Sequence, residues 1–172
     1  GMAACMAIEK ITGLTAEIKW PNDVVINKKK TTGILTEMGM SEGKISYVVV
    51  GIGINLNMES FPEELAYKAT SLKIECGHEI NRDEIAAALL FYFEQYYEKF
   101  EQTHNLGFLI EEYNNHLVNR GKEVLIKEKD GEYTGISRGI NDKGELLVEK
   151  KDGNCVEIFS GEVSVRGLYG YV

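Results

Sequence analysis

The chain has 172 residues, of which 44% are hydrophobic and 27% are charged, and its formal net charge at pH 7 is −8. These values are typical of a globular protein and exclude a chain that is disordered by composition. The acidic balance also argues against a nucleic-acid partner or an anionic membrane surface, because either needs clustered Lys and Arg and the only basic run is Lys28-Lys29-Lys30.

The cysteines are Cys5, Cys76 and Cys155, which lie far apart without any CxxC spacing, so we expect free thiols in a reducing compartment. No apolar segment approaches the roughly 20 residues that a membrane helix needs, and no signal-peptide pattern opens the chain. The histidines have no ligand spacing, and no metal site is predicted. Together these observations predict a soluble, cytoplasmic protein with no membrane partner.

The first element is a helix predicted over residues 2–11, which are rich in Ala, Met and Ile, with Gly13 at its C-terminal end. Residues 17–20 form a short strand that leads into a turn at Pro21. Residues 24–26 are all β-branched and predict a second strand, and the polar residues 27–29 predict a hairpin tip. The return strand is expected over residues 31–38.

This hairpin places Asp23 and Lys30 near the ends of neighbouring strands. A lysine close to a hairpin tip is commonly just a solvated edge charge, so this alternative stays open at this point.

Residues 45–50 form a nearly continuous apolar run, which predicts a strand buried on both faces. The strand ends in the sequence GIGIN at residues 51–55. The spacing GxGxN differs from the dinucleotide fingerprint GxGxxG. The glycines are compatible with a bulge or close packing, and equally with a planar ligand that approaches the backbone while Asn55 pairs with it.

A short helical or irregular piece follows from Ser60. Asn81 and Glu84 form a capping-box pattern that predicts the start of a long core helix. Its apolar residues recur at helical spacing, at Ile85, Leu89, Tyr92, Tyr96 and Phe100. This spacing favours a buried helix face over a base-stacking platform. A second helix, packed antiparallel to the first, is predicted over residues 106–117.

Beyond Gly121 the sequence predicts five short strands separated by turn residues, at 124–126, 133–137, 146–148, 156–158 and 163–165. This pattern is typical of a small barrel or sandwich. Such a unit has little core of its own, so we expect it to lean on the preceding α/β region.

Three motifs, KWPND at 19–23, KTTGIL at 30–35 and GIGIN at 51–55, resemble in order and spacing the catalytic domain of biotin protein ligases, the biotin–[acetyl-CoA-carboxylase] ligases. GISRGI at 135–140 and GEVSVRG at 161–167 resemble the C-terminal domain of that family. The resemblance implies an α+β fold: part of a class II synthetase-like catalytic domain, a mixed sheet with helices, over residues 1–120, followed by an SH3-like β-barrel over residues 121–172.

The family's GRGRxG loop, which binds biotin and phosphate, has no counterpart in these residues. We therefore expect the chain to be the second part of such a ligase, without the N-terminal portion of the catalytic domain and inactive when isolated. The alternatives are a non-catalytic ligase-fold module for binding or assembly, and a relative of the lipoate ligases.

The resemblance implies a two-step reaction. Biotin and ATP, which brings Mg²⁺, give biotinyl-5′-AMP, and the biotin then passes to a lysine of the biotin carboxyl carrier protein of acetyl-CoA carboxylase. Family sheets commonly pair side by side, so a homodimer through the sheet edge around Val48-Val49-Val50 is expected as well.

The resemblance also assigns the candidate site residues. Lys30 and Asp23 are the candidate catalytic residues, with Lys30 beside the biotin carboxylate and the α-phosphate and Asp23 near the incoming lysine. The candidate biotin and phosphate site comprises Lys30, Gly33 and Lys19. The candidate nucleotide site comprises Asn55, Gly53, Ile54 and Arg166.

Overall fold

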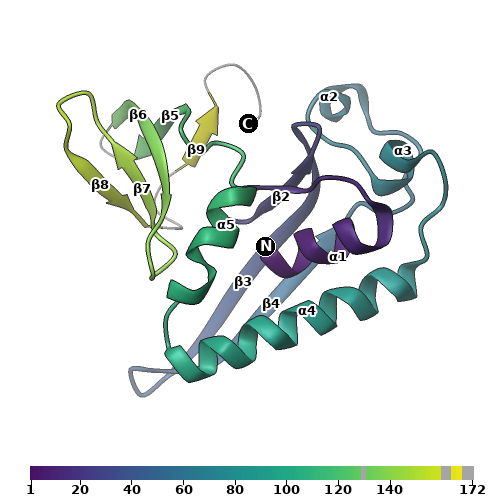
Figure 1. The fold of residues 1–172 in the computed structure, drawn as a ribbon, viewed down its shortest axis with the longest axis horizontal. Coiled ribbons are helices and arrows are strands. Elements are labelled where there is room, and N and C mark those ends of the chain that lie inside the picture. The colour runs from purple at the N-terminus through teal and green to yellow at the C-terminus, as the bar shows by residue number, and fades with distance from the viewer. Residues whose placement is uncertain (129–130, 160–163, 168–172) are drawn as a thin grey trace.

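The structure is a computed structural model that describes residues 1–128, 131–159 and 164–167; for residues 128 and 164–167 only the backbone is described. The helices are α1 (Met2–Thr12), α2 (Glu63–Ala66), α3 (Leu72–Cys76), α4 (Arg82–Thr103) and α5 (Ile110–His116), with a 3-10 turn at Gly107–Leu109. The strands are β1 (Glu17–Lys19), β2 (Asp23–Ile26), β3 (Lys29–Ser41), β4 (Lys44–Ile54), β5 (Glu123–Glu128), β6 (Gly131–Ile140), β7 (Leu146–Glu149), β8 (Cys155–Ile158) and β9 (Ser164–Gly167). Figure 1 shows their arrangement.

The first sheet has the strand order β1-β2-β3-β4, and its neighbouring strands pair antiparallel. The α+β class is confirmed, but the predicted mixed sheet is antiparallel throughout its described strands. In the part of the chain that is described, parallel pairing outside the named strands occurs as isolated bridges at Ile18–Leu117 and Lys30–Ala69. The predicted hairpin tip is confirmed as a two-residue turn, in which Asn27 and Lys28 have φ of 49° and 65°.

Helix α1 supplies much of the first hydrophobic core. It ends at Gly13, whose φ of 72° is the left-handed conformation that glycine adopts without strain. Its buried side chains pack with those of β1, β2 and α3 in one cluster, which includes Cys5, Ile8, Ile18, Val24, Ile26 and Leu72. The helix predicted over residues 2–11 is thus confirmed.

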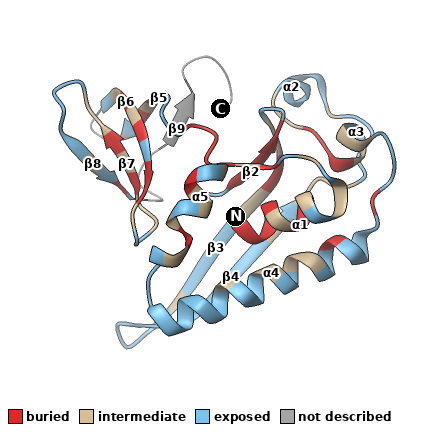
Figure 2. Cartoon of the chain, viewed as in Figure 1, coloured by how far each residue is buried: buried red, intermediate tan, exposed pale blue. Residues whose placement is uncertain are grey.

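Helix α4 begins where the capping pattern predicts, because the Asn81 side chain accepts a hydrogen bond from the Asp83 N–H. The predicted buried face is confirmed in part, because Ile85 belongs to the first core and Leu89 and Tyr96 pack against it. Of its residues only Ile85 is fully buried, and Phe91 and Phe93 are exposed. One stripe of α4 packs against α1, and its other sides are open (Figure 2).

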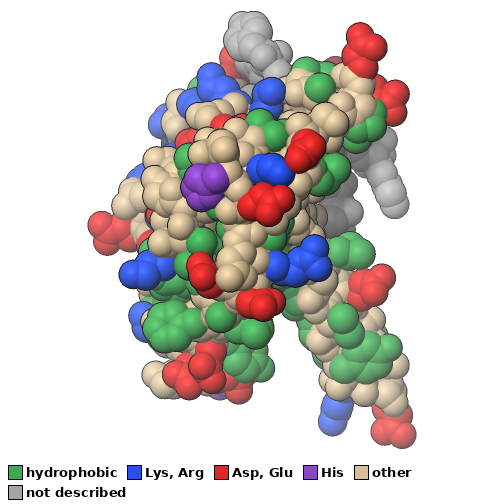
Figure 3. All heavy atoms as spheres, turned by 90° about the vertical axis from the view of Figure 1, so that its right-hand side faces the viewer, with side chains coloured by type: hydrophobic (Ala, Val, Ile, Leu, Met, Phe, Trp, Pro, Cys, Tyr) green, Lys and Arg blue, Asp and Glu red, His purple; other side chains and the backbone are tan. Residues whose placement is uncertain are grey.

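The prediction that residues 45–50 are buried on both faces was also wrong. Strands β3 and β4 form a long ribbon, and β4 lies at the edge of the sheet. Val48, Val49 and Val50 are 53%, 53% and 43% exposed. The apolar run does make both faces of the ribbon apolar, but no described residues cover them. In the side view of Figure 3, hydrophobic side chains lie open at the surface, with acidic and basic ones interspersed.

The second sheet has the order β8-β7-β6-β5-β9. Its five strands confirm the small C-terminal β-domain. Its core is a second cluster that contains Val124, Ile126, Ile140, Leu146, Val148 and Ile158. Trp20 and Leu117 belong to this cluster too, so the barrel does lean on the first region. The domain division at residue 120 remains a prediction. None of the described helices is long and apolar enough to cross a membrane.

Candidate functional site

A β-bulge brings Lys30 and Gly33 onto the same face of the sheet as Asp23. Asp23 pairs with Gly33 and Val25 pairs with Lys30, and the register shifts between them. On a regular strand, residues three apart would point to opposite faces, so the shift at Thr31 is what aligns them. The Thr31 hydroxyl donates to the Val24 carbonyl at 3.1 Å, which holds the bulge together in the buried interior.

Lys30 and Asp23 form an ion pair between Nζ and Oδ1. The Lys30 side chain is 39% exposed and that of Asp23 is 11% exposed, so the pair lies at the surface with the carboxylate on the inner side. A Cβ placed on Gly33 would lie 3.1 Å from both Lys30 Cε and Lys30 Nζ. The glycine therefore leaves the space through which the lysine reaches the aspartate.

Beside this pair lies a shallow hollow of about 480 Å³. Its lining residues are Asn22, Lys30, Gly33, Ile34, Leu35, Gly51, Ile52 and Gly53. In the ladder Gly53 pairs with Gly33 and Gly51 pairs with Leu35, so the glycines of β3 and β4 lie side by side in its floor.

Gly51 and Gly53 are not required by the fold itself. A Cβ at either position would have a backbone oxygen as its nearest neighbour, at 3.7 Å and 3.9 Å, which is ordinary van der Waals contact. Neither residue has a positive φ. What the two glycines do provide is a flat stretch of backbone, on which a planar ligand can lie closely.

Asn55 follows β4 and is held by three hydrogen bonds. Its N–H donates to the Thr31 carbonyl at 2.7 Å, and its carbonyl accepts from Leu72 N–H at 2.9 Å. Its Nδ2 donates to the Thr70 carbonyl at 3.1 Å. The backbone N–H is thus already used, which leaves the Oδ1 atom and the second amide hydrogen as the groups able to meet a ligand. Ile54 packs against the first core.

Lys30 and Asn55 are connected through the segment that precedes α3. The Lys30 N–H donates to the Lys68 carbonyl at 2.8 Å, and the Thr70 N–H donates to the Lys30 carbonyl at 2.9 Å. Because the Asn55 amide also bonds Thr70, this segment fixes both ends of the site relative to each other.

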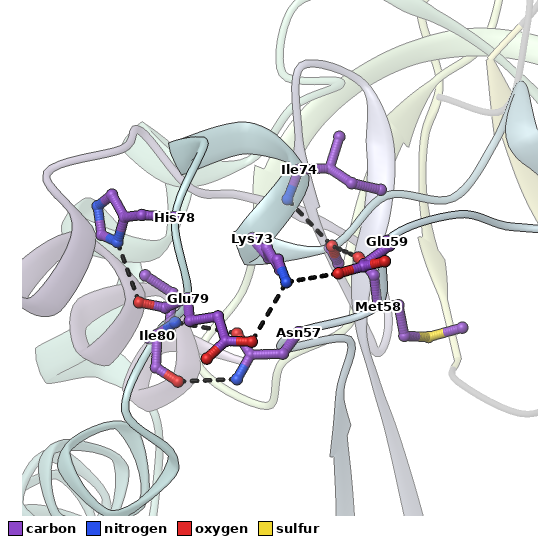
Figure 4. A network of polar contacts seen from close by, with 9 residues as sticks. Asn57, Met58, Glu59, Lys73, Ile74, His78, Glu79 and Ile80 are labelled. Atoms are coloured by element: carbon purple, nitrogen blue, oxygen red, sulfur yellow. Dashed lines mark hydrogen bonds and ion pairs between the residues drawn. The ribbon is translucent and has the colours of Figure 1, made fainter.

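A polar network stabilises the chain after Asn55 (Figure 4). Asn57 exchanges hydrogen bonds with the backbone of Ile80, both at 2.9 Å. The Lys73 ammonium donates to Glu59 at 2.8 Å and to Glu79 at 3.2 Å. These hydrogen bonds raise the pKa of Lys73 above its usual value. The network is exposed, so we assign it a role in shaping the segment and none in chemistry.

Lys19 lies next to this group, and Arg166 lies in the other sheet. Lys19 stands opposite Asp23 in the β1–β2 ladder. Arg166 pairs with Leu125 in the barrel, and its side chain lies outside the described residues.

Sequence reasoning missed Asn22 as a site residue. Its Nδ2 donates to the Ile34 carbonyl at 2.8 Å, and its own carbonyl accepts from Ile34 N–H at 2.9 Å. The turn that carries Asp23 is therefore fastened to β3. The place of Asn22 at the bend of the KWPND motif was the signal available in the sequence.

The Cys5 thiol lies in the first core and takes no part in this site. Burial raises the pKa of the Cys5 thiol to about 12, so it stays protonated inside the core. No group of three or more His, Cys, Asp or Glu residues that could hold a metal ion occurs in the described ranges.

Comparison with known proteins finds two family models along the chain. Residues 1–55 match the biotin/lipoate A/B protein ligase family, and residues 121–166 match the biotin protein ligase C-terminal domain.

Among curated relatives, the bifunctional ligase/repressor BirA of Bacillus subtilis is 36% identical over 166 residues, which are 95% of this chain and 50% of BirA. A biotin–[acetyl-CoA-carboxylase] ligase of Paracoccus denitrificans is 30% identical over 151 residues, which are 84% of this chain and 62% of that ligase. The chain thus spans about half the length of the first of these relatives.

Among solved structures, biotin protein ligase from Aquifex aeolicus is 33% identical with a TM-score of 0.85, and the match covers 97% of this chain and 72% of that one. The same ligase in complex with biotin and ATP matches with the same TM-score of 0.85.

Proposed function

The chain belongs to the biotin protein ligase family, and from this premise we propose that its hollow is part of a site that activates biotin with ATP. The products are biotinyl-5′-AMP and pyrophosphate. A lysine of biotin carboxyl carrier protein, the biotinylated part of acetyl-CoA carboxylase, then attacks the mixed anhydride and releases AMP. The Lys30–Asp23 pair beside a glycine floor is the observation that carries this proposal.

Lys30 supplies the positive charge that the first step needs. The biotin carboxylate and the triphosphate are both anionic, so their approach is opposed unless a cation lies at the meeting oxygens. When the carboxylate oxygen bonds the α-phosphorus and the bond to pyrophosphate breaks, negative charge grows on the phosphate oxygens. The Lys30 ammonium is partly exposed at the hollow and can move from Asp23 to these oxygens.

Asp23 acts in the second step. Once Lys30 is drawn to the acyl-phosphate, the Asp23 carboxylate is released from that ammonium and can accept a proton from the ammonium of the incoming lysine. The freed amine then attacks the biotinyl carbonyl carbon, and AMP leaves with the electron pair of the broken C–O bond.

The nucleotide lies at the Asn55 end of the site in this proposal. Gly53 gives the base a flat surface, Ile54 forms part of the supporting core, and the Asn55 side chain pairs with the adenine. Lys19 is proposed to contact the phosphates, and Arg166 is proposed to contact the nucleotide. Mg²⁺ would come with the triphosphate, because no metal cage of three acidic, His or Cys ligands is found in the described ranges.

The GRGRxG loop of the family would have to come from a further polypeptide segment, since residues 1–172 contain no such sequence. Without it, the reactants lack a wall that orients them, and orientation contributes several kcal/mol to catalysis. We therefore expect biotin-dependent ATP–pyrophosphate exchange to be absent from the 172-residue chain alone. We expect exchange when the part of the Aquifex ligase that this chain does not match is joined to it.

Lys30→Ala in the joined protein should lower this exchange about a hundredfold, the scale of one lost transition-state charge contact. Lys28→Ala is the matched control, since Lys28 lies in the same basic run but at the hairpin turn. Equal losses from the two variants would mean that the run acts only as a diffuse positive field. Exchange by the 172-residue chain alone, above its own Lys30→Ala variant, would show that no further segment is needed.

Asn55→Ala should weaken ATP binding by roughly 1–2 kcal/mol, the value of a hydrogen bond in a partly buried site. Calorimetry on the joined protein measures the affinity. Because the Asn55 amide also bonds the Thr70 carbonyl, Thr70→Ala, which keeps that carbonyl, is the control for general loosening of the segment. Unchanged ATP affinity in Asn55→Ala would remove Asn55 from the nucleotide site.

A further inference from the structure

Trp20 joins the first sheet to the core of the barrel. Its side chain is 4% exposed and belongs to the second hydrophobic cluster, whose other described buried members all lie at residue 117 or later. The indole Nε1–H donates to the Gly144 carbonyl at 3.0 Å. An aromatic side chain from the KWPND turn is therefore anchored in another structural unit.

The barrel turn whose Gly144 carbonyl accepts from Trp20 is itself held by hydrogen bonds. It connects β6 to β7, and Asn141 Oδ1 accepts from the N–H groups of Lys143 and Glu145, both at 3.0 Å. Gly144 has φ of 82°, and its N–H donates to the Asn141 carbonyl at 3.0 Å. The Asp142 carbonyl accepts from Leu106 N–H at 2.7 Å, which ties the turn to the helical region as well.

The chain between Trp20 and Asp23 is short and is fastened to β3. Asn22 exchanges two hydrogen bonds with Ile34, and Asp23 is paired with Gly33 in the sheet. Only Pro21 and Asn22 separate the anchored indole from Asp23, so the backbone path from Trp20 to the carboxylate that contacts Lys30 is short.

From these contacts we propose that Trp20 is a positioning residue, through which the β6–β7 turn of the barrel sets the position of Asp23 and of the Lys30 ammonium. Its importance for the reaction rests on the proposed function. The mechanical link does not, and it can be measured without any ligand.

The test uses the 172-residue chain and the fact that Trp20 is its only tryptophan. Asn141→Ala removes the side chain that organises the β6–β7 turn. We expect the Trp20 emission maximum to move to longer wavelength, and the backbone amide resonances of Asp23 and Gly33 to shift in ¹⁵N–¹H spectra.

Asn154→Ala is the matched control. In the neighbouring β7–β8 turn the Asn154 backbone N–H donates to Asp152 Oδ1 at 3.0 Å and its side-chain Nδ2 donates to Asp152 Oδ2 at 2.8 Å. The variant removes the side-chain bond, and Asn154 makes no described contact with Trp20. This variant should leave both the emission and the two amide resonances in place.

Trp20→Phe is a second, conservative variant that keeps an aromatic ring in the cluster and removes the N–H donor. It should retain the barrel's own resonances while those of Asp23 and Gly33 shift. If Asn141→Ala moves the emission of Trp20 but neither it nor Trp20→Phe moves the Asp23 and Gly33 resonances beyond the Asn154→Ala control, Trp20 is a core residue only. Absence of pyrophosphate exchange from the unmutated joined protein would overturn the proposed function but not this result.

Discussion

The glycines of the β3–β4 hairpin occupy their positions for different physical reasons. At Gly33 an added methyl group would press against the Lys30 ammonium, so glycine there serves the ion pair. At Gly51 and Gly53 neither backbone conformation nor packing within the described chain demands glycine. At Gly43, in the turn between β3 and β4, φ is 76° and the backbone itself demands it.

Gly53→Ala should therefore weaken ATP binding without lowering the stability of the fold. The free energy of unfolding should stay the same or rise by about 0.5–1 kcal/mol, because alanine restricts the unfolded chain and fits the strand. ATP affinity of the joined protein should fall, because the methyl group projects into the hollow. Denaturant unfolding and calorimetry measure the two effects.

Gly43→Ala is the control for this prediction and should behave in the opposite way. We expect it to lose about 1 kcal/mol of stability, since alanine is strained at this φ, and to bind ATP normally. The assignment of Gly53 to a ligand surface would be abandoned if its alanine variant bound ATP as tightly as the parent.

At the scale of elements, the sequence predicted well what depends on neighbours along the chain. The hairpin over residues 23–38, the end of α1 at Gly13 and the start of α4 after Asn81 all follow from local turn and capping chemistry. The burial of β4 and α4 could not be predicted in this way, because an apolar pattern shows which faces are apolar and not whether another element covers them.

The candidate site shows the same limit. The motifs located Asp23, Lys30 and Gly33 in the sequence, but their shared face depends on the bulge at Thr31. A one-residue shift in register has no residue pattern of its own here. The role of Trp20 in the barrel core likewise joins residues 124 positions apart, a distance at which periodicity carries no information.

The contact between α5 and β6 gives a prediction at this scale. Asn114 is buried, and its Oδ1 accepts from the Ile140 N–H at 2.9 Å. Gly139, with φ of 119°, lets the side chain approach, since a Cβ there would lie 2.6 Å from the same oxygen. Asn114→Ala should cost about 1–3 kcal/mol, because it leaves a buried N–H without a partner.

Urea unfolding measures this cost, and Asn115→Ala provides the comparison. Asn115 is the next residue on α5 and is exposed, and its Oδ1 accepts a hydrogen bond from the exposed Arg120 at 3.2 Å. Its loss should change stability by less than about 0.5 kcal/mol. Equal costs for the two asparagines would contradict the assignment of Asn114 as the buried link between helix and barrel.

For the whole molecule, the contrast is between two cores, both packed against Tyr113, and residues 35–50 of the β3–β4 ribbon, which belong to neither core. The second cluster takes Trp20 and Leu117 from before the barrel, so the barrel and the first sheet are expected to unfold together. The ribbon formed by β3 and β4 instead exposes Leu35, Met38, Met40, Ile45, Tyr47, Val48, Val49 and Val50. Exposed apolar area of this kind is typical of interaction surfaces.

We predict that the protein that binds this surface includes a second copy, paired through the β4 edge as a homodimer. Since the Asn55 N–H points inward to Thr31, alternation along the strand turns the N–H groups of Val50 and Val48 outward, where a partner strand can bond them.

Val48→Lys should convert the dimer to a monomer in sedimentation experiments at tens of micromolar, because a buried ammonium at the joined edge is unpaired. Leu90→Lys adds the same charge on the open side of α4, where the parent residue is 67% exposed, and should leave the dimer intact. A parent chain that sediments as a strict monomer would refute the pairing, and a dimer disrupted equally by both variants would place the interface elsewhere or attribute it to charge alone.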